Sequence, residues 1–258
     1  MDRSPGQAGG TSGAALPSRE IRRIPLFVPR QYRPPDVSWM LRLMRGNPLA
    51  LMATNGDPGR APLATHLPVI LDPESPLPDS DSLAGLGLLA HLNRANPQWI
   101  QVRPGMEVLF SFTGPHSYVS PVVYGLPTAA PTWDFTAVQV RGEIVERFES
   151  PEDTLRVVTA TVRAYERDFG AGWDMTGSIP YFRQILPGVG AFRVRALSVE
   201  GMFKLSQEQP EDVREKVRDH FAHRGQGRDL ELAGLMANPR AASACPCAGQ
   251  FEELKHGV

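Results

Sequence analysis

The sequence predicts an α+β fold in which mainly antiparallel strands carry peripheral helices. Two observations support this prediction. The segments 49–54 and 63–71 are rich in apolar residues and are joined by Asn55-Gly56-Asp57-Pro58-Gly59, a dense turn signal that favours a β-hairpin. Two amphipathic segments, 37–45 and 150–169, each follow residues that cap helices. Hairpin strands and capped helices in one chain are typical of an α+β protein.

The two long helices have clear starts. Val37 to Arg45 follows Asp36, a suitable N-cap, and its apolar residues recur at the i, i+3, i+4 and i+7 spacing of a helix with one buried face. The second helix begins at the capping-box-like Ser150-Pro151-Glu152-Asp153 and runs to about Phe169. We expect its apolar stripe to consist of Leu155, Val158, Val162 and Tyr165.

Further strands are predicted over 86–92, 108–112, 137–148 and 191–199. The strand 108–112 is bounded by Gly114-Pro115, so His116 is expected just past its end. In 137–148 apolar and polar residues alternate, and Gly142 is predicted to mark a bulge. The intervening loop is aromatic, almost uncharged and stiffened by four prolines, which suits a planar cofactor with polar edges.

Shorter helices complete the expected fold. Asn96-Pro97 opens one, with Asn as cap and Pro as first residue, and another covers 181–186. A terminal helix over 210–223 is expected to bury Val213, Val217 and Phe221. We expect one domain over residues 21–224, a disordered tail over 1–20 and a loosely packed tail over 225–258.

Composition narrows the function classes. A net charge of −1 and a pI near 6.6 give no global attraction to nucleic acid. The start of the chain lacks the apolar core of a signal peptide and no apolar run approaches about 18 residues, so no membrane association and a cytoplasmic location are expected. Cys245 and Cys247 are too few for a structural zinc site and are expected to be mobile tail thiols, the alternative being an adventitious metal or redox role. No nucleophile-elbow, P-loop, GxGxxG or HExxH pattern is present, which sets aside hydrolases, kinases and zinc proteases.

Four separated motifs point to a family. They are ATHLP at 64–68, HLNRANPQW at 91–99, the pair GPHSYVSP and PTWDFTAVQVRG within 114–142, and FKLSQ at 203–207. In this order they resemble the PaiB family, described as FMN-binding transcriptional regulators on the split β-barrel of flavin reductases and pyridoxamine-phosphate oxidases. The resemblance covers about 24–224. It implies a split barrel and a homodimer with cofactor sites at or near the subunit interface.

The departures from the family pattern suggest a specialised branch. Family members typically have Trp, Asn and His where this chain has Val123, Asp134 and Gln139, and we expect these three positions to cluster around the pocket. Together with GAGWDMTGSIPYFRQILPGVGAF at 170–192 and KLSQEQP, they resemble the haem-dependent piperazate synthases of peptide biosynthesis. This resemblance implies haem b, with FMN as the alternative, and conversion of N5-hydroxy-L-ornithine to L-piperazate by N–N bond formation.

The resemblance assigns candidate histidines and rings. His66 is the expected axial iron ligand, because neutral imidazole is a good iron donor and a sheet fixes its direction. The alternative for His66 is an imidazole tied to a backbone carbonyl. His116 is the competing ligand, and its alternative is a turn histidine packed on Tyr118. Tyr118 and Trp133 are expected to stack on the cofactor, and His91 is expected to be a satisfied strand residue.

The polar candidates complete the expected site. Arg94, Asn96 and Trp99 are expected to hold a phosphate or propionate, the alternative being plain capping plus a buried Trp. Lys204 and Ser206 form a second candidate anion site, the alternative being a solvated Lys. As catalytic candidates, Asp134 would receive a substrate ammonium or act as a base, and Lys204 would hold one end of the amino-acid substrate.

Two rival functions stay open. The first is an FMN-binding PaiB-type regulator without catalysis, which needs a basic surface; Arg19, Arg22, Arg23, Arg30 and Arg33 could supply it or could equally form a solvated tail. The second is a flavin or haem oxidoreductase, which shares the fold and requires an external electron donor. One pocket architecture can serve either cofactor, so sequence alone leaves both open.

Overall fold

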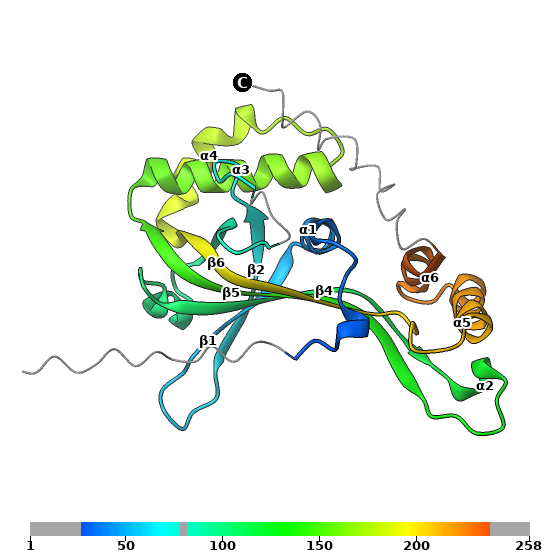
Figure 1. Ribbon diagram of the computed structural model, residues 1–258. Coiled ribbons are helices and arrows are strands. Elements are labelled where there is room, and N and C mark those ends of the chain that lie inside the picture. Colours follow the sequence, from blue (N-terminus) through cyan, green and yellow to red (C-terminus); the bar gives the residue numbers. More distant parts are fainter. Residues whose placement is uncertain (1–26, 78–81, 238–258) are drawn as a thin grey trace, which may run out of the picture.

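The computed structural model describes residues 27–77 and 82–237, and its centre is a closed antiparallel barrel with the strand order β1-β2-β3-β6-β5-β4 (Figure 1). The strands are β1 (Leu49–Thr54), β2 (Leu63–Leu71), β3 (Gly87–Asn93), β4 (Glu107–Val119), β5 (Thr132–Phe148) and β6 (Val189–Lys204). The α+β split-barrel class predicted from the sequence is confirmed.

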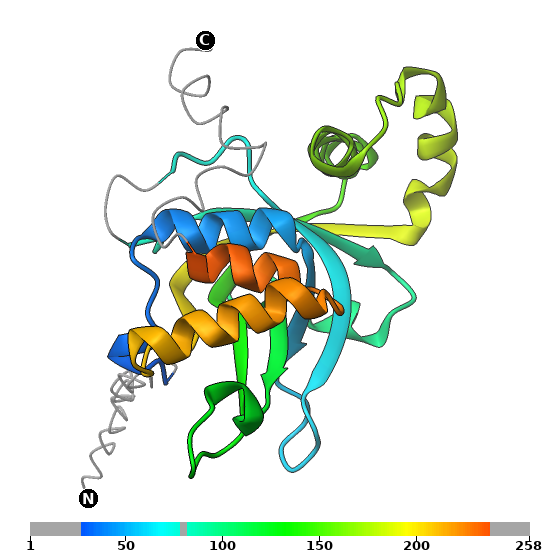
Figure 2. The same cartoon turned by 90° about the vertical axis from the view of Figure 1, so that its right-hand side faces the viewer.

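The helices flank the barrel. They are α1 (Val37–Gly46), α2 (Pro121–Tyr124), α3 (Pro151–Phe169), α4 (Ile179–Ile185), α5 (Glu211–Arg224) and α6 (Asp229–Ala237), with 3₁₀ turns at Arg30–Tyr32, Pro97–Gln101, Thr176–Ser178 and Leu186–Gly188. Helices α1, α6 and α5 lie side by side over one face, whereas α3 and α4 form a separate arm (Figure 2). No helix in the described ranges is long and apolar enough to cross a membrane.

The barrel interior is apolar because alternate residues of each strand point inward. Phe110, Phe112, Val138, Val140 and Phe192 are all buried in it. The apolar face of α1 packs against the same core. The interior of the barrel is therefore a packed apolar core.

Several local predictions are confirmed. Asp36 accepts a hydrogen bond from the Ser38 amide at 2.8 Å and caps α1. Ser150 accepts one from the Asp153 amide at 3.1 Å and caps α3. Strands β1 and β2 form the predicted hairpin, and a register shift of the β5–β6 ladder marks the bulge at Gly142.

The central loop is shorter than the sequence predicts. β4 continues through Gly114-Pro115 to Val119, so His116 lies within a strand, and β5 already begins at Thr132. The ladder tolerates Pro115, which lacks an amide donor, because a bulge falls between Thr113 and His116. Gly114 fits here because a Cβ would stand 2.3 Å from the Thr136 hydroxyl oxygen.

Three further expectations were wrong in detail. The buried residues of α3 are Thr154, Val157, Thr159 and Thr161, whereas the predicted apolar residues are half-buried. The Thr161 hydroxyl donates to the Val157 carbonyl at 2.9 Å and can therefore be buried. β6 extends five residues past the predicted end at position 199. Within the segment expected to be loosely packed, residues 229–237 form α6, which buries Leu232 and Met236.

The remaining tail predictions lie outside the described residues. They concern residues 1–20, the arginines at 19, 22 and 23, and the two cysteines. Arg30 and Arg33 are described: Arg30 is the first residue of the 3₁₀ turn Arg30–Tyr32, and Arg33 is its C-cap.

Candidate functional site

The outer face of β2, β1, β4 and β5 carries the predicted histidines and rings. We call this surface the open face and define it by His66, Leu51, Ser111, His116, Tyr118 and Trp133. His66 pairs with Leu51 across β1–β2, and Leu51 pairs with Ser111 across β1–β4, so these three form one cross-strand row. The helices α1, α5 and α6 lie on the other side of the β4–β5 hairpin (Figures 1 and 2).

The His66 imidazole is exposed. Within the described residues it makes no hydrogen bond and no ring contact, so the alternative of an imidazole tied to a backbone carbonyl does not apply. The direction of its strand is fixed because the whole of β1 pairs with residues Leu63 to Pro68 of β2. The imidazole nitrogens are therefore free to bind a ligand that approaches the open face.

Three rings form an aromatic cluster at the far end of the open face. The ring of Trp133 lies 5.5 Å from that of His116 and 6.1 Å from that of Tyr118. Trp133 is 51% exposed and Tyr118 is 42% exposed, values that are high for such large side chains. His116 therefore packs on Trp133, which differs from the expected packing on Tyr118. We refer to these three residues as the aromatic cluster.

The strand register separates His66 from the aromatic cluster. Allowing for the bulge, His116 lies about four ladder positions beyond the His66 row, and Tyr118 about six, at roughly 3.3 Å per position. His116 is therefore about 13 Å away along the strands, and Tyr118 about 20 Å, with two strand spacings in addition. Within one chain, these residues line different parts of the same face.

The two catalytic candidates meet at the inner side of this hairpin. The Lys204 ammonium lies 3.6 Å from Asp134 Oδ1 and 3.6 Å from Glu208 Oε1, and it donates to Thr132 Oγ1 at 2.6 Å and to the Trp133 carbonyl at 3.0 Å. Asp134 accepts hydrogen bonds from the Ser206 hydroxyl at 2.6 Å and the Ser206 amide at 3.1 Å. Asp134, Lys204 and Ser206 thus form one buried network.

Burial determines both the pKa of Asp134 and whether a substrate can reach it. Asp134 is 0% exposed, and desolvation raises the pKa of its carboxyl from 3.8 to about 6, although Ser206 and Lys204 act in the opposite direction. The Lys204 side chain is only 12% exposed. A substrate ammonium cannot reach the Asp134 oxygens in this arrangement, which differs from the substrate-facing position predicted from the sequence.

The third predicted group, Arg94, Asn96 and Trp99, lies in or just before the 3₁₀ turn Pro97–Gln101. Asn96 caps the turn Pro97–Gln101 by accepting from the Gln98 amide, and its Nδ2 donates to Thr65 Oγ1 at 2.9 Å. Trp99 is buried, with the Arg147 guanidinium 4.1 Å and the Arg94 guanidinium 5.6 Å from its ring centre. Capping plus a buried Trp therefore describes Asn96 and Trp99, and anion binding by Arg94 stays a prediction.

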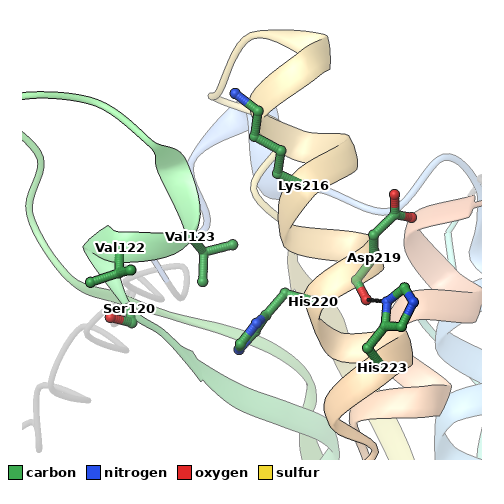
Figure 3. A pocket seen from close by; sticks show the side chains of 7 residues that line it. All are labelled: Ser120, Val122, Val123, Lys216, Asp219, His220 and His223. Carbon is green, nitrogen blue, oxygen red and sulfur yellow. Dashed lines mark hydrogen bonds between the residues drawn. The ribbon is translucent and has the colours of Figure 1, made fainter.

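The three positions that depart from the family pattern do not cluster. Gln139 points to the outer side of β5 and Asp134 to the inner side, because odd and even residues of a strand alternate. Val123 lies in a groove between α2 and α5 that is lined by Ser120, Val122, Val123, Lys216, Asp219, His220 and His223. Val123 and His220 point into this groove from opposite sides (Figure 3).

Other polar groups do not belong to the predicted site. His91 was expected to be satisfied, yet its Nδ1 is buried without a hydrogen-bond partner in the described part of the chain, and burial lowers its pKa. No group of three or more His, Cys, Asp or Glu suited to a metal ion occurs among the described residues. A cavity of about 800 Å³ lies between α3, β2 and residues 72–77, and none of the predicted residues lines it.

Sequence reasoning missed several members of the buried network. Thr132 and Glu208 contact the Lys204 ammonium, and Tyr32 places its ring centre 5.8 Å from it. Arg224, which donates to Ser117 and pairs with Asp229 at 2.7 Å, supports the same hairpin from α5. Local sequence patterns do not predict these contacts, because each contact joins segments that are distant in sequence or separated by a turn.

Comparisons with known proteins identify sequences and structures that are similar to this chain. The chain is 26% identical over 215 residues to the protease synthase and sporulation protein PAI 2 of Bacillus subtilis, covering 82% of this chain and 96% of that protein. A conserved hypothetical protein of Mycobacterium tuberculosis is 16% identical with a TM-score of 0.47, covering 72% of this chain and 94% of that one. The FAD and haem binding protein of Mycobacterium smegmatis is 14% identical with a TM-score of 0.45, covering 70% and 77%. Residues 26–198 match the family described as "Putative FMN-binding domain", and the chain belongs to this family.

Proposed function

We propose that this protein is a haem-dependent enzyme that converts N5-hydroxy-L-ornithine to L-piperazate by forming an N–N bond. The observation that carries the proposal is the state of His66, an exposed imidazole on the outer face of a strand that makes no hydrogen bond within the described residues. The motif resemblance to piperazate synthases supplies the reaction. Membership of a family described as FMN-binding supports a planar cofactor on the barrel.

The residues of the open face fit a haem. His66 would hold the iron, because neutral imidazole is a common axial ligand and the β1–β2 pairing fixes its direction. Aromatic side chains that are half exposed, such as Trp133 and Tyr118, can cover a flat macrocycle and exclude water. His116 is the second candidate ligand.

The distance between His66 and the aromatic cluster favours a homodimer. Along the sheet, Tyr118 lies about 20 Å beyond the His66 row, so the aromatic cluster of one chain does not reach the His66 of the same chain. A two-fold axis through the open face would bring the aromatic cluster of a second copy over His66, since such an interface uses the same patch twice. The complete site would then contain residues from both copies.

The proposed reaction depends on how the two substrate nitrogens are positioned, and it consumes no reductant. A bound haem, held by His66, would supply a Lewis-acidic iron that favours loss of the N–OH oxygen. The substrate's own α-amine attacks the hydroxylated nitrogen, the N–N bond forms, the N–O bond breaks and water leaves, so no external reductant is needed. The open face would keep the flexible chain folded, and ordering of reacting groups can contribute about 7–11 kcal/mol.

One experiment tests this function directly. Haem-loaded protein is incubated with N5-hydroxy-L-ornithine in the absence of NAD(P)H, and mass spectrometry follows the product. The proposal predicts a product lighter by one water molecule that carries an N–N bond, and no product with the His66→Ala variant. Turnover that requires NAD(P)H would instead indicate an oxidoreductase.

The family description favours a second candidate, an FMN-binding protein without catalysis. In that case the open face would bind FMN, and the aromatic cluster would stack on its isoalloxazine ring. Purified protein would then carry a flavin spectrum, and haem would bind no more tightly to the wild-type protein than to the His66→Ala variant.

A further inference from the structure

The aromatic cluster needs support from outside itself. Trp133 is 51% exposed, and its ring contacts within the described residues are those with His116 and Tyr118. Rings that are half in water gain little from packing, so the place of the Trp133 ring depends on how firmly its backbone is held. That backbone belongs to the first residues of β5, next to the loop that contains α2.

The ladder holds this part of β5 from one side. On the β4 side, Trp133 pairs with Tyr118 and Thr132 pairs with Val119. On the β6 side, pairing begins only at Phe135, opposite Lys204, so among the described residues Thr132 to Asp134 extend past the end of β6. A backbone carbonyl at such a position needs a donor from elsewhere.

The Lys204 side chain supplies that donor. Its ammonium donates to the Trp133 carbonyl at 3.0 Å and to the Thr132 hydroxyl at 2.6 Å. Lys204 is the last residue of β6, so its side chain continues the ladder where the strand stops. Hydrogen bonds from an ionised donor are shorter and stronger than those between neutral groups.

Carboxylates hold the ammonium in place. Asp134 and Glu208 each lie 3.6 Å from Lys204 Nζ, which is needed because the side chain is only 12% exposed. Asp134 is itself fixed by the hydroxyl and the amide of Ser206. Ser206 has a φ of 55°, a left-handed conformation that costs free energy for a residue other than glycine, and these two bonds stabilise it.

Titration of Asp134 adds a test of the same network. Burial raises the pKa of its carboxyl to about 6, against the effect of Ser206 and Lys204. The other titratable groups that act on it or respond to it are Glu208, beyond β6, Tyr32 in the first 3₁₀ turn, and Tyr124 in α2. Arg224 faces the neighbouring Ser117. Protonation of Asp134 below pH 6 would remove one counter-charge of Lys204.

We propose that Lys204 is the positioning residue of the aromatic cluster: its ammonium, held by Asp134 and Glu208, fixes Thr132 and Trp133 and thereby sets where the cluster meets a cofactor. Neither Lys204 nor Asp134 then touches substrate. The role at a cofactor rests on the proposed function, whereas the effect on Trp133 is a property of the chain alone.

Fluorine NMR of protein labelled with 5-fluorotryptophan tests the proposal without a cofactor. The chain has four tryptophans, and the Trp133→Phe variant assigns one of the four signals. The Lys204→Met variant should shift and broaden the Trp133 signal and leave those of Trp39, Trp99 and Trp173 in place. The matched control is Lys216→Met, which removes an exposed lysine of α5 that pairs with Asp212. Lys204→Arg, which keeps charge and donors, should restore most of the wild-type spectrum.

A pH series adds a readout that a merely structural role would not give. The Trp133 signal of the wild-type protein should move with a midpoint near pH 6, and this step should be lost in Asp134→Asn. In haem titrations, Lys204→Met should raise the dissociation constant by about tenfold or more, the effect of losing one charge-assisted hydrogen bond.

The outcomes separate this inference from the proposed function. An unchanged Trp133 signal in Lys204→Met overturns the inference, even if haem binds and the reaction proceeds. If Lys204→Met does not fold, Thr132→Val removes one acceptor with little change of shape, and an unmoved Trp133 signal there overturns the inference as well. A wild-type protein that binds no haem refutes the proposed function and leaves the NMR result standing.

Discussion

Replacing Asp134 by asparagine is expected to stabilise the protein at neutral pH. The change removes a buried charge and keeps the contacts with Ser206, because the amide oxygen can accept from the Ser206 amide while the amide nitrogen donates to the Ser206 hydroxyl. Asparagine is also the residue that the PaiB resemblance leads us to expect at this position.

The expected gain in the free energy of unfolding follows from the pKa of Asp134, which burial raises from 3.8 to about 6. One pKa unit corresponds to about 1.4 kcal/mol, so the ionised carboxylate destabilises the fold by about 3 kcal/mol relative to the protonated form. Between about pH 4 and pH 6, the folded chain keeps a proton that the unfolded chain has lost. The free energy of unfolding of the wild-type protein therefore falls as pH rises through this window, and the loss is complete above about pH 6.

Urea unfolding of both proteins between pH 4 and pH 7.5 measures this effect. The quantity of interest is the difference in unfolding free energy between Asp134→Asn and wild type, in which most other titrating groups cancel. We expect it to be near zero at pH 4 and to rise to about 3 kcal/mol at pH 7. Asp174→Asn, at an exposed carboxylate that bonds to Thr176, is the control and should show no such rise. A variant less stable than wild type at pH 7 would show that the ion pair with Lys204 outweighs burial and would refute the reasoning.

Two further changes test the packing around the site. Gly190→Ala should lower the free energy of unfolding by about 1–3 kcal/mol, because its Cβ would stand 2.7 Å from the Trp99 ring. Thermal unfolding measures this loss, with Gly188→Ala as the control because a Cβ at Gly188 meets open space. Equal stabilities of the two variants would contradict the clash. Asp229→Asn should cost about 2 kcal/mol at pH 7, because it breaks the pair with Arg224, which lowers the pKa of Asp229. The stabilisation by Asp229 is present above about pH 4 and is lost as pH falls through its lowered pKa. The unfolding free energies of wild type and Asp229→Asn should therefore become equal in acid. A difference between them that is independent of pH would count against the ion pair.

The sequence predicts those parts of the fold that depend on local chemistry. The cap at Asp36, the cap at Ser150 and the bulge at Gly142 each require only a few neighbouring residues, and all three are present. The buried face of α5 is likewise the predicted set Val213, Val217 and Phe221. Periodicity and capping act within one element, so the sequence of that element is sufficient to predict them.

The parts that sequence analysis missed depend on contacts between distant segments. Gly114-Pro115 resembles the end of a strand, yet pairing with β5 carries β4 past it. The sequence identified both Asp134 and Lys204, but their contact depends on the register between β5 and β6, which no local pattern reveals. Both residues were predicted to contact substrate, but in the fold they are buried. The sequence does not show this, because a residue's exposure depends on the helices that cover it. His66 was predicted mid-strand, and only the folded barrel shows that its imidazole is exposed and makes no hydrogen bond to any residue within 27–77 and 82–237.

The assignment of His66 as the iron ligand is tested by absorption spectra of wild type, His66→Ala and His116→Ala, each purified from haem-supplied cells. We expect a Soret band in the wild-type protein that collapses in His66→Ala and persists in His116→Ala. A flavin spectrum in the wild-type protein, or a Soret band unchanged by His66→Ala, would contradict the assignment of His66 as the iron ligand on the open face.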